Sequence, residues 1–211
     1  IYLEVGDKQG NFSKQIAVWG AITFDGNGNY SLANASVLDS SVGGAARSLT
    51  FTGTYAISAS GYGFMDSPAL NQGTLYGLVA RGIFIASSTE DEVNDLFVAA
   101  QVPATPPNDA AFNGAYWVAE MAFPSATAAR ARDALFQINP NGAGSLGNLN
   151  VTGYSGGSGT KVSQSITAAR YGFAPGAGTL TFGTSASALS GTRILYVSAD
   201  QNFIFGGSDS S

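Results

Sequence analysis

Short runs of β-branched and aromatic residues recur along the chain, alternate with small or polar residues, and end in clusters of Gly, Asn, Asp and Ser. Alternation with a period of two is typical of half-buried strands, and the clusters suit tight turns. A helical period is almost absent. Turns spaced about 8 to 12 residues apart predict about six to eight strands in each half of the chain. Because the connections are short, neighbouring strands should be antiparallel.

One sequence unit occurs twice. Residues 22–32 match residues 136–146 at an offset of 114 residues, and the offset has grown to 120 where residues 83–88 match residues 203–208. Other matching pairs are Tyr2 with Tyr116, and residues 54–57 with residues 170–173. Repetition at a fixed period is the signature of a modular fold. We attribute the growing offset to small loop insertions.

The repeat divides the chain into copy one at residues 1–100, a Pro-rich linker at 101–113, and copy two at 114–211. Prolines in the linker remove backbone donors and favour an extended spacer. The predicted fold class is all-β, with two tandem copies of an antiparallel meander. Each copy forms a small barrel or a folded-over sandwich, or both merge into one larger barrel.

One segment of copy one departs from the strand pattern. Ser87 followed by Glu90 fits a helix capping box, and Asp91 and Glu92 suit a first helical turn. Residues 87–97 are therefore expected to form either a helix or a loop.

Three motifs of copy one resemble a group of secreted bacterial tandem β-repeat proteins of unassigned function. They are residues 21–29, residues 51–57 and residues 61–63. Copy two departs from the first motif, because Asn139 and Pro140 take the place of the Asp–Gly pair. The resemblance implies an extracellular location and a β fold, and it implies no reaction.

Composition narrows the classes of partner. Hydrophobic residues make up 45% of the 211 residues, enough for a core, whereas charged residues make up only 11%, against about 25% in an average soluble domain. The surface should be polar but weakly charged, and such surfaces associate readily. A net charge of −5 without a basic cluster argues against nucleic acid as a partner.

The weak charge and the start of the chain at Ile1 together predict a secreted protein, extracellular or on the cell surface. There is no cysteine, so disulfides do not report the compartment. No apolar run approaches the roughly 18 residues of a membrane-spanning helix, so membrane insertion is not expected. The chain begins at Ile1 in strand-like sequence, as a secreted chain would after signal-peptide removal, although a trimmed chain would begin in the same way.

The residues of most catalytic mechanisms are missing. The chain has no histidine, which is the usual general base and the commonest transition-metal ligand. Residues 153–157 fit G-x-S-x-G and residues 158–161 fit S-x-x-K, but both lie in a Gly/Ser-rich loop. Catalysis by carboxylates alone would have to use the glutamates, none of which lies in a recognisable motif. They are Glu4, Glu90, Glu92 and Glu120. We therefore predict no enzymatic activity and no cofactor.

Two acidic segments raise the question of calcium. Asp25, Asn27 and Asn29 have the spacing of the first three ligands of a calcium loop, but the distal glutamate is missing, so a hairpin turn is favoured. A denser cluster comprises Glu90, Asp91, Glu92 and Asp95. A solvated acidic loop is favoured there too, with calcium binding as the weaker alternative.

Four N-x-[ST] sequons are candidate glycosylation sites, where chance would supply roughly two or three. They lie at Asn11, Asn29, Asn34 and Asn150.

The first functional hypothesis is a non-enzymatic structural protein of the cell exterior that associates with copies of itself in a surface layer or filament. Strand-forming segments that could add to a neighbouring molecule lie close to both ends. They comprise Ile1, Tyr2 and Leu3, and Phe203, Ile204 and Phe205. The alternative is a β-barrel binding module, in which a barrel interior or an aromatic face formed by Tyr116, Trp117 and Trp19 holds a small apolar ligand or a glycan.

Overall fold

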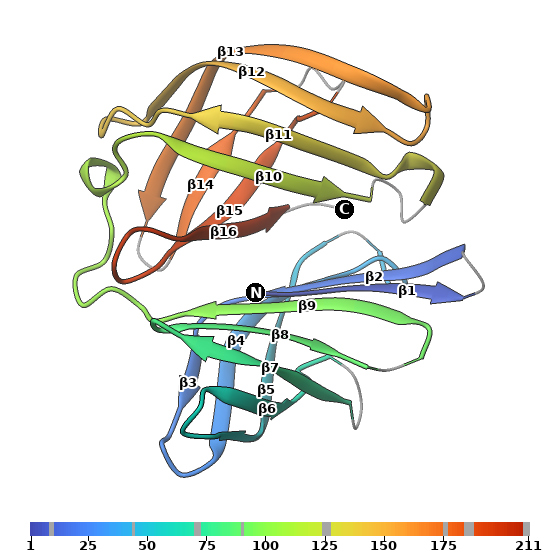
Figure 1. Ribbon diagram of the computed structural model, residues 1–211, viewed down its shortest axis with the longest axis vertical. Coiled ribbons are helices and arrows are strands. Elements are labelled where there is room, and N and C mark those ends of the chain that lie inside the picture. The colour runs from blue at the N-terminus through green and yellow to red at the C-terminus, as the bar shows by residue number, and fades with distance from the viewer. Residues whose placement is uncertain are drawn as a thin grey trace. The chain divides into compact units, whose positions relative to one another are not determined.

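The computed structural model describes residues 1–8, 11–43, 45–69, 73–89, 91–123, 128–174, 177–183 and 188–208. As predicted, the chain is all-β and contains two β units (Figure 1). Unit 1 spans Ile1–Val102 and unit 2 spans Pro103–Asp209.

Unit 1 is a closed antiparallel barrel. Its strands are β1 (Tyr2–Lys8), β2 (Asn11–Trp19), β3 (Ile22–Phe24), β4 (Asn29–Asp39), β5 (Arg47–Ile57), β6 (Tyr62–Asp66), β7 (Thr74–Ala80), β8 (Ile83–Ser88) and β9 (Val93–Ala100). Because β2 and β3 both pair with β4, they act as one strand interrupted at Gly20 and Ala21, and the barrel has eight strands. β9 completes it by pairing antiparallel with both β1 and β8.

Unit 2 is a curled sheet that does not close. It comprises the 3-10 turn η1 (Asp109–Ala111), β10 (Tyr116–Ala122), the 3-10 turn η3 (Ala128–Arg130), β11 (Arg132–Ile138), β12 (Ser145–Ser155), β13 (Thr160–Ala174), β14 (Ala177–Thr181), β15 (Thr192–Val197) and β16 (Ile204–Ser208). The seven strands pair in chain order, from β10 at one edge to β16 at the other. Each strand is antiparallel to the next.

The turn that leads into β4 in unit 1, and into β12 in unit 2, shows how the copies align. In unit 1 the Asp25 carboxylate accepts hydrogen bonds from the backbone N–H groups of Asn27 (2.7 Å) and Asn29 (2.9 Å). In unit 2 the side-chain oxygen of Asn141 accepts from Ala143 (2.8 Å) and Ser145 (3.1 Å) in the same way. Each residue closes the turn as an Asx cap. Asp25 is thus matched by Asn141, at an offset of 116 residues, and the alignment of its Asp–Gly pair with Asn139 and Pro140 is wrong by two positions.

Strand register extends the correspondence to the rest of the repeat. In unit 1 Asn29 lies opposite Thr54, and in unit 2 Ser145 lies opposite Arg170. Both residues of the second pair follow their counterparts by 116 positions. Near the end of the repeat, Gly77 lies opposite Ala86 as Leu195 lies opposite Gly206. Strands β4 to β8 therefore match β12 to β16. Within the described residues, no strand of unit 2 matches β9.

The segment at residues 87–97 forms strand at both ends, so neither a helix nor a loop describes it as a whole. Ser87 and Ser88 end β8, a turn follows, and Val93 begins β9. The outward and inward alternation of β9 is weak in the sequence because Asn94 and Asp95 interrupt it. Only the barrel, which offers β1 and β8 as partners, makes this segment a strand.

The predicted linker is too long at its C-terminal end. Asn108 caps η1, and Phe112, which the sequence assigns to the linker, is 1% exposed in the core of unit 2. Its ring lies 5.0 Å from the rings of both Tyr116 and Tyr171, measured between centroids. The Tyr171 hydroxyl also donates to the backbone carbonyl oxygens of Asp109 and Phe112 (both 3.0 Å). This segment is therefore part of the folded unit.

Truncating Phe112 should destabilise unit 2 selectively. We expect Phe112→Ala to lower the free energy of unfolding of unit 2 by about 3–5 kcal/mol, because a buried aromatic ring is lost and a cavity remains. Each unit contains one tryptophan, Trp19 or Trp117, so Trp→Phe variants that keep one of them report the urea unfolding of each unit separately. Val102→Ala, at a side chain that is 70% exposed, is the control and should change little. Equal effects of the two substitutions would contradict this assignment.

Candidate functional site

A buried polar cluster lies inside the unit 1 barrel. The Tyr2 hydroxyl is 2.9 Å from Asp95 Oδ2 and 3.1 Å from Glu4 Oε2, and Glu4 is only 4% exposed. Burial raises the pKa of Glu4, and burial together with the charges of Glu4 and Asp95 raises the pKa of Tyr2. The remaining oxygen of Asp95 accepts hydrogen bonds from Ser87 Oγ (2.9 Å) and the Ser88 backbone N–H (2.6 Å). The Asp95 carboxylate therefore joins β9 to β1 and β8, whereas the bond between Tyr2 and Glu4 lies within β1.

The weaker alternative for the acidic segment, calcium binding, finds no assembled site in the part of the chain that the structure describes. Glu90 lies outside the described residues, and Asp91 and Glu92 form the exposed turn between β8 and β9. Asp95 lies on β9 with its carboxylate held by three donors. Among the described residues, no group of three or more acidic side chains is placed to hold a metal ion.

The serine motifs and the glutamates Glu4 and Glu120 lie on different strands. Residues 153–161, which include both serine motifs, form the end of β12, a hairpin turn and the start of β13, so the strand-to-helix turn of a nucleophile elbow is missing there. Of the glutamates, Glu4 is in unit 1 and Glu120 is in unit 2, where it pairs with Arg193 at 2.6 Å.

Three sequon asparagines are exposed: Asn29, Asn34 and Asn150. Asn29 donates from its side chain to Asp25 (2.7 Å), and Asn150 accepts from Ser165 Oγ (3.2 Å). The fourth, Asn11, is the first residue of β2. Their glycosylation stays a prediction.

The two predicted strand-addition segments differ in whether they have an unpaired edge. Tyr2 and Leu3 lie in β1, which is paired on one side with β2 and on the other with β9, and the amino group of Ile1 donates to the Val98 carbonyl oxygen (2.7 Å). Strand addition at Ile1, Tyr2 and Leu3 is therefore a wrong prediction for the closed barrel. By contrast, Ile204 and Phe205 lie on β16, at an edge of the open sheet, and Phe203 directly precedes it.

The two edges of unit 2 run in the same direction. An odd number of antiparallel strands separates β10 from β16, and both arrows point the same way in Figure 1. One further strand, antiparallel to both, could form backbone hydrogen bonds with both edges. In unit 1, β9 pairs in this way with β1 and β8.

The interior of unit 2 is less covered along these edges. Phe84 and Ala86 of β8 are buried, whereas their counterparts on β16, Ile204 and Gly206, are half-buried and exposed. The first strands show the same contrast: the inward residues of β1 are buried (Tyr2, Glu4 and Gly6), and those of β10 are half-buried (Tyr116, Val118 and Glu120). A missing neighbour along both edges accounts for this exposure.

Backbone direction identifies the groups at these edges. The Phe203 carbonyl oxygen accepts from the Ser198 N–H on the β15 side (2.9 Å), so in an antiparallel ladder the backbone groups of the next residue, Ile204, face away from β15. On β10 the Gly114 N–H donates to the Pro140 carbonyl oxygen (3.2 Å), and the same alternation turns Ala119 away from β11. Ile204 and Ala119 thus present backbone groups to a further strand.

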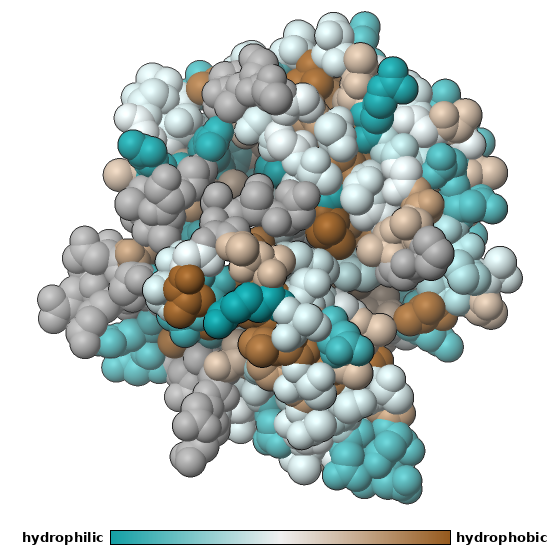
Figure 2. Space-filling view, turned by 180° about the vertical axis from the view of Figure 1, so that it is seen from behind, coloured by the Kyte–Doolittle hydropathy of each residue, from teal (hydrophilic) through white to brown (hydrophobic). Residues whose placement is uncertain are grey.

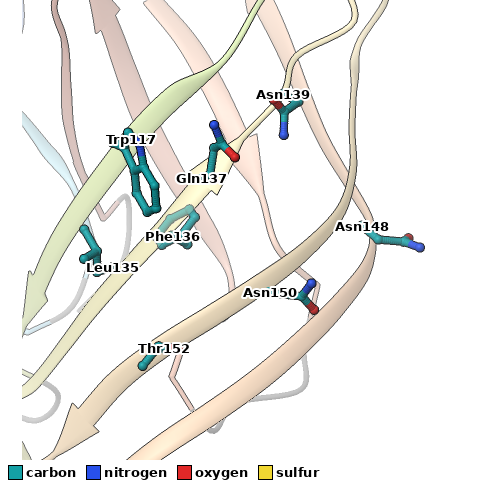
Figure 3. Close-up of a pocket in the computed structure, with 8 residues that line it drawn as sticks. All are labelled: Trp117, Leu135, Phe136, Gln137, Asn139, Asn148, Asn150 and Thr152. Atoms are coloured by element: carbon teal, nitrogen blue, oxygen red, sulfur yellow. The ribbon is translucent and has the colours of Figure 1, made fainter.

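A groove of about 450 Å³ lies on the outer face of unit 2, across β10, β11 and β12 (Figure 3). Trp117 forms one wall and is 72% exposed. Polar side chains form most of the rest: Gln137, Asn139, Asn148, Asn150 and Thr152. Figure 3 shows Trp117 beside Gln137 on neighbouring strands, with Asn150 and Thr152 across the groove on β12.

The predicted aromatic face does not form as a unit. Tyr116 and Trp117 are consecutive residues of a strand, so they point to opposite faces of the sheet. Tyr116 packs inward on Phe112 and only Trp117 reaches the groove. Trp19 lies in unit 1. The amide side chains of the groove were missed because they lie on different strands, and nothing in the sequence marks them as neighbours.

No protein-family model, curated protein or solved structure matches this chain. Within the described ranges, no helix has the length and apolar character needed to span a bilayer.

The buried Glu4 should make the stability of unit 1 depend on pH. Since its pKa in the folded barrel lies above the ordinary value of 4.5, the carboxyl is protonated in both states at low pH and ionises first in the unfolded chain. The stabilisation is complete below about pH 4.5 and is lost as the pH rises toward the raised pKa.

Urea titrations of wild type and Glu4→Gln between pH 4 and pH 7 test this expectation. The wild type should lose stability relative to the variant as the pH rises, by at most about 1.4 kcal/mol per pH unit. A constant difference across this range would show that burial does not shift the Glu4 equilibrium.

Proposed function

We propose that the chain is a non-enzymatic structural protein of the cell exterior, which associates with copies of itself through the open sheet of unit 2 as a subunit of a surface layer or filament. The observation that carries the proposal is the pair of parallel edges, β10 and β16, in a unit whose counterpart is closed by one more strand. Exposed edges with unpaired backbone groups are templates for another chain.

The outer face of unit 1 offers a second kind of contact. Five large apolar side chains are each at least 40% exposed on β6, β7 and β8: Tyr62, Phe64, Tyr76, Leu78 and Ile85. They are contiguous, since Phe64 lies opposite Tyr76, and Leu78 lies opposite both Tyr62 and Ile85. Contiguous exposed apolar patches are typical of interaction surfaces.

Weak surface charge removes the usual barrier to such contacts. Only 11% of residues are charged, and on the face shown in Figure 2 most residues have pale colours of intermediate hydropathy, with hydrophobic residues among them. Copies of a weakly charged protein repel each other little, so short-range contacts decide whether they associate.

Because unit 2 has two different edges, β10 and β16, copies can associate head to tail. Pairing β10 of one copy with β16 of the next is a heterologous contact, which propagates into a filament or closes into a ring. Pairing an edge with its own equivalent would stop at a dimer.

Proline at an edge residue should weaken self-association. Ala119→Pro removes a backbone donor that faces away from β11, so the sheet itself can tolerate the substitution, and Ile204→Pro does the same on β16. We expect each to weaken association about five- to tenfold, the effect of about one hydrogen bond. Sedimentation velocity over a range of concentrations, together with electron microscopy, measures the change. Ala119→Ser and Ile204→Val keep the N–H groups and are the matched controls.

Mixing the two proline variants tests the heterologous contact. Each variant keeps one intact edge, so an equal mixture should form heterodimers with the wild-type affinity, about five- to tenfold tighter than the association of either variant alone. Wild-type protein that stays monomeric at all concentrations would refute the proposal, and unchanged association in both proline variants would show that the edges are not the contact.

A further inference from the structure

The groove on the outer face of unit 2 arises where two strands separate. The ladder between β11 and β12 runs from Arg132 opposite Ser155 to Leu135 opposite Thr152, and within the described residues it extends no further. β11 nevertheless continues to Ile138. The positions that would follow in this register, Phe136 to Ile138, are therefore unpaired on the β12 side in the described part of the chain. Further along, Pro140 lacks an N–H group and Gly147 of β12 has a positive φ of 70° at a register shift, so the ladder does not resume there.

The corresponding ladder of unit 1 also stops, at Trp19 opposite Ser36, but after the interruption at Gly20 and Ala21 it resumes, with Ile22 opposite Leu32. Within the described residues, no such second ladder joins β11 to β12. The break is therefore shared by both units, and the separation that follows it belongs to unit 2. The buried ring of Phe136 lies beneath it, so the groove has an apolar floor.

Several side-chain amides in the walls of the groove have hydrogen-bonding groups that are free, within the described part of the chain, to bind a ligand. Among the described residues, the side-chain amides of Gln137 and Asn139 make no hydrogen bond with the rest of the protein. Asn150 uses its oxygen to accept from Ser165, which leaves its NH₂ group for another partner. An amide offers both donors and acceptors, and this is the chemistry that matches a hydroxyl group, which both donates and accepts.

Charge and aromatic character narrow the ligand further. None of the residues that line the groove is ionisable except at extreme pH, so the groove offers no counter-charge to an anion or a cation. Trp117 presents an exposed indole beside the amides, and its direct cross-strand neighbour is Gln137. A flat aromatic ring next to uncharged hydrogen-bonding groups suits a ligand with an apolar C–H face and hydroxyl edges.

We propose that this groove binds a neutral oligosaccharide, with a sugar ring stacked on Trp117 and its hydroxyl groups bonded to Gln137, Asn139 and Asn150. The volume of about 450 Å³ lies within the range of about 300–1,000 Å³ that is usual for small-ligand sites. β-Linked glucose and N-acetylglucosamine are the sugars we expect to bind, because their ring hydrogens form flat apolar faces. Trp117 lies on the edge strand β10, but the groove is on the outer face of the sheet and binding a sugar there does not require self-association.

Binding is measured with cellopentaose and chitopentaose as probes, on protein from a host without N-glycosylation so that the Asn150 side chain is unmodified. In the Trp19→Phe variant, Trp117 is the only tryptophan, and either sugar should change its emission in a saturable manner. By calorimetry, Trp117→Ala should weaken binding at least about tenfold, and Gln137→Ala or Asn139→Ala about two- to tenfold.

Met121→Ala is the matched control, because Met121 lies on the same strand and face as Trp117, is 70% exposed, and does not line the groove. It should bind like the wild type, and all variants should keep the wild-type unfolding temperature, since the substituted side chains are exposed. Pentagalacturonate, an anionic oligosaccharide, should not bind. The proposal fails if neither neutral sugar binds, if Trp117→Ala binds as tightly as the wild type, or if the anionic probe binds equally well.

Discussion

An antiparallel sheet can close on itself only with an even number of strands, because otherwise its first and last strands run in the same direction. This constraint separates the two units of the chain. Unit 1 closes into a barrel of eight strands, and β9 is the strand that makes closure antiparallel throughout. Unit 2 repeats the hairpins of unit 1 but has seven strands, so β10 and β16 remain edges.

Closure also decides which side chains each interior can hold. The closed barrel buries Tyr2 and Glu4 and supplies Asp95 from β9 as a partner for the Tyr2 hydroxyl. The open unit instead holds an ion pair between Glu120 and Arg193, whose side chains stay 17% and 16% exposed. Removing an ion pair completely from water costs desolvation free energy. Because both side chains stay partly exposed in the open unit, this pair has a smaller desolvation cost.

The same openness supports both functional proposals, through different parts of unit 2. Its edges present backbone groups that a further strand can pair with, and its separated strands β11 and β12 leave a groove with unused amides beside Trp117. Neither feature requires an ionisable group, which agrees with a chain of only 11% charged residues and no histidine. The chemistry offered is recognition by hydrogen bonds and apolar contact.

Local patterns in the sequence were enough to predict the all-β fold and the duplication, because strand alternation and turn residues such as Asp25 act over a few neighbouring positions. The same local patterns misaligned the Asn141 turn of copy two with the Asp25 turn of copy one. Only the structure shows that the Asn141 side chain caps the turn, by accepting from the backbone N–H groups of Ala143 and Ser145. The role of residues 93–100 as the closing strand, the place of Phe112 in a core, and the meeting of Trp117 with amides from other strands were decided only by tertiary structure. Each depends on pairing between segments distant in sequence, and a pattern of neighbouring residues does not specify which distant segments will meet.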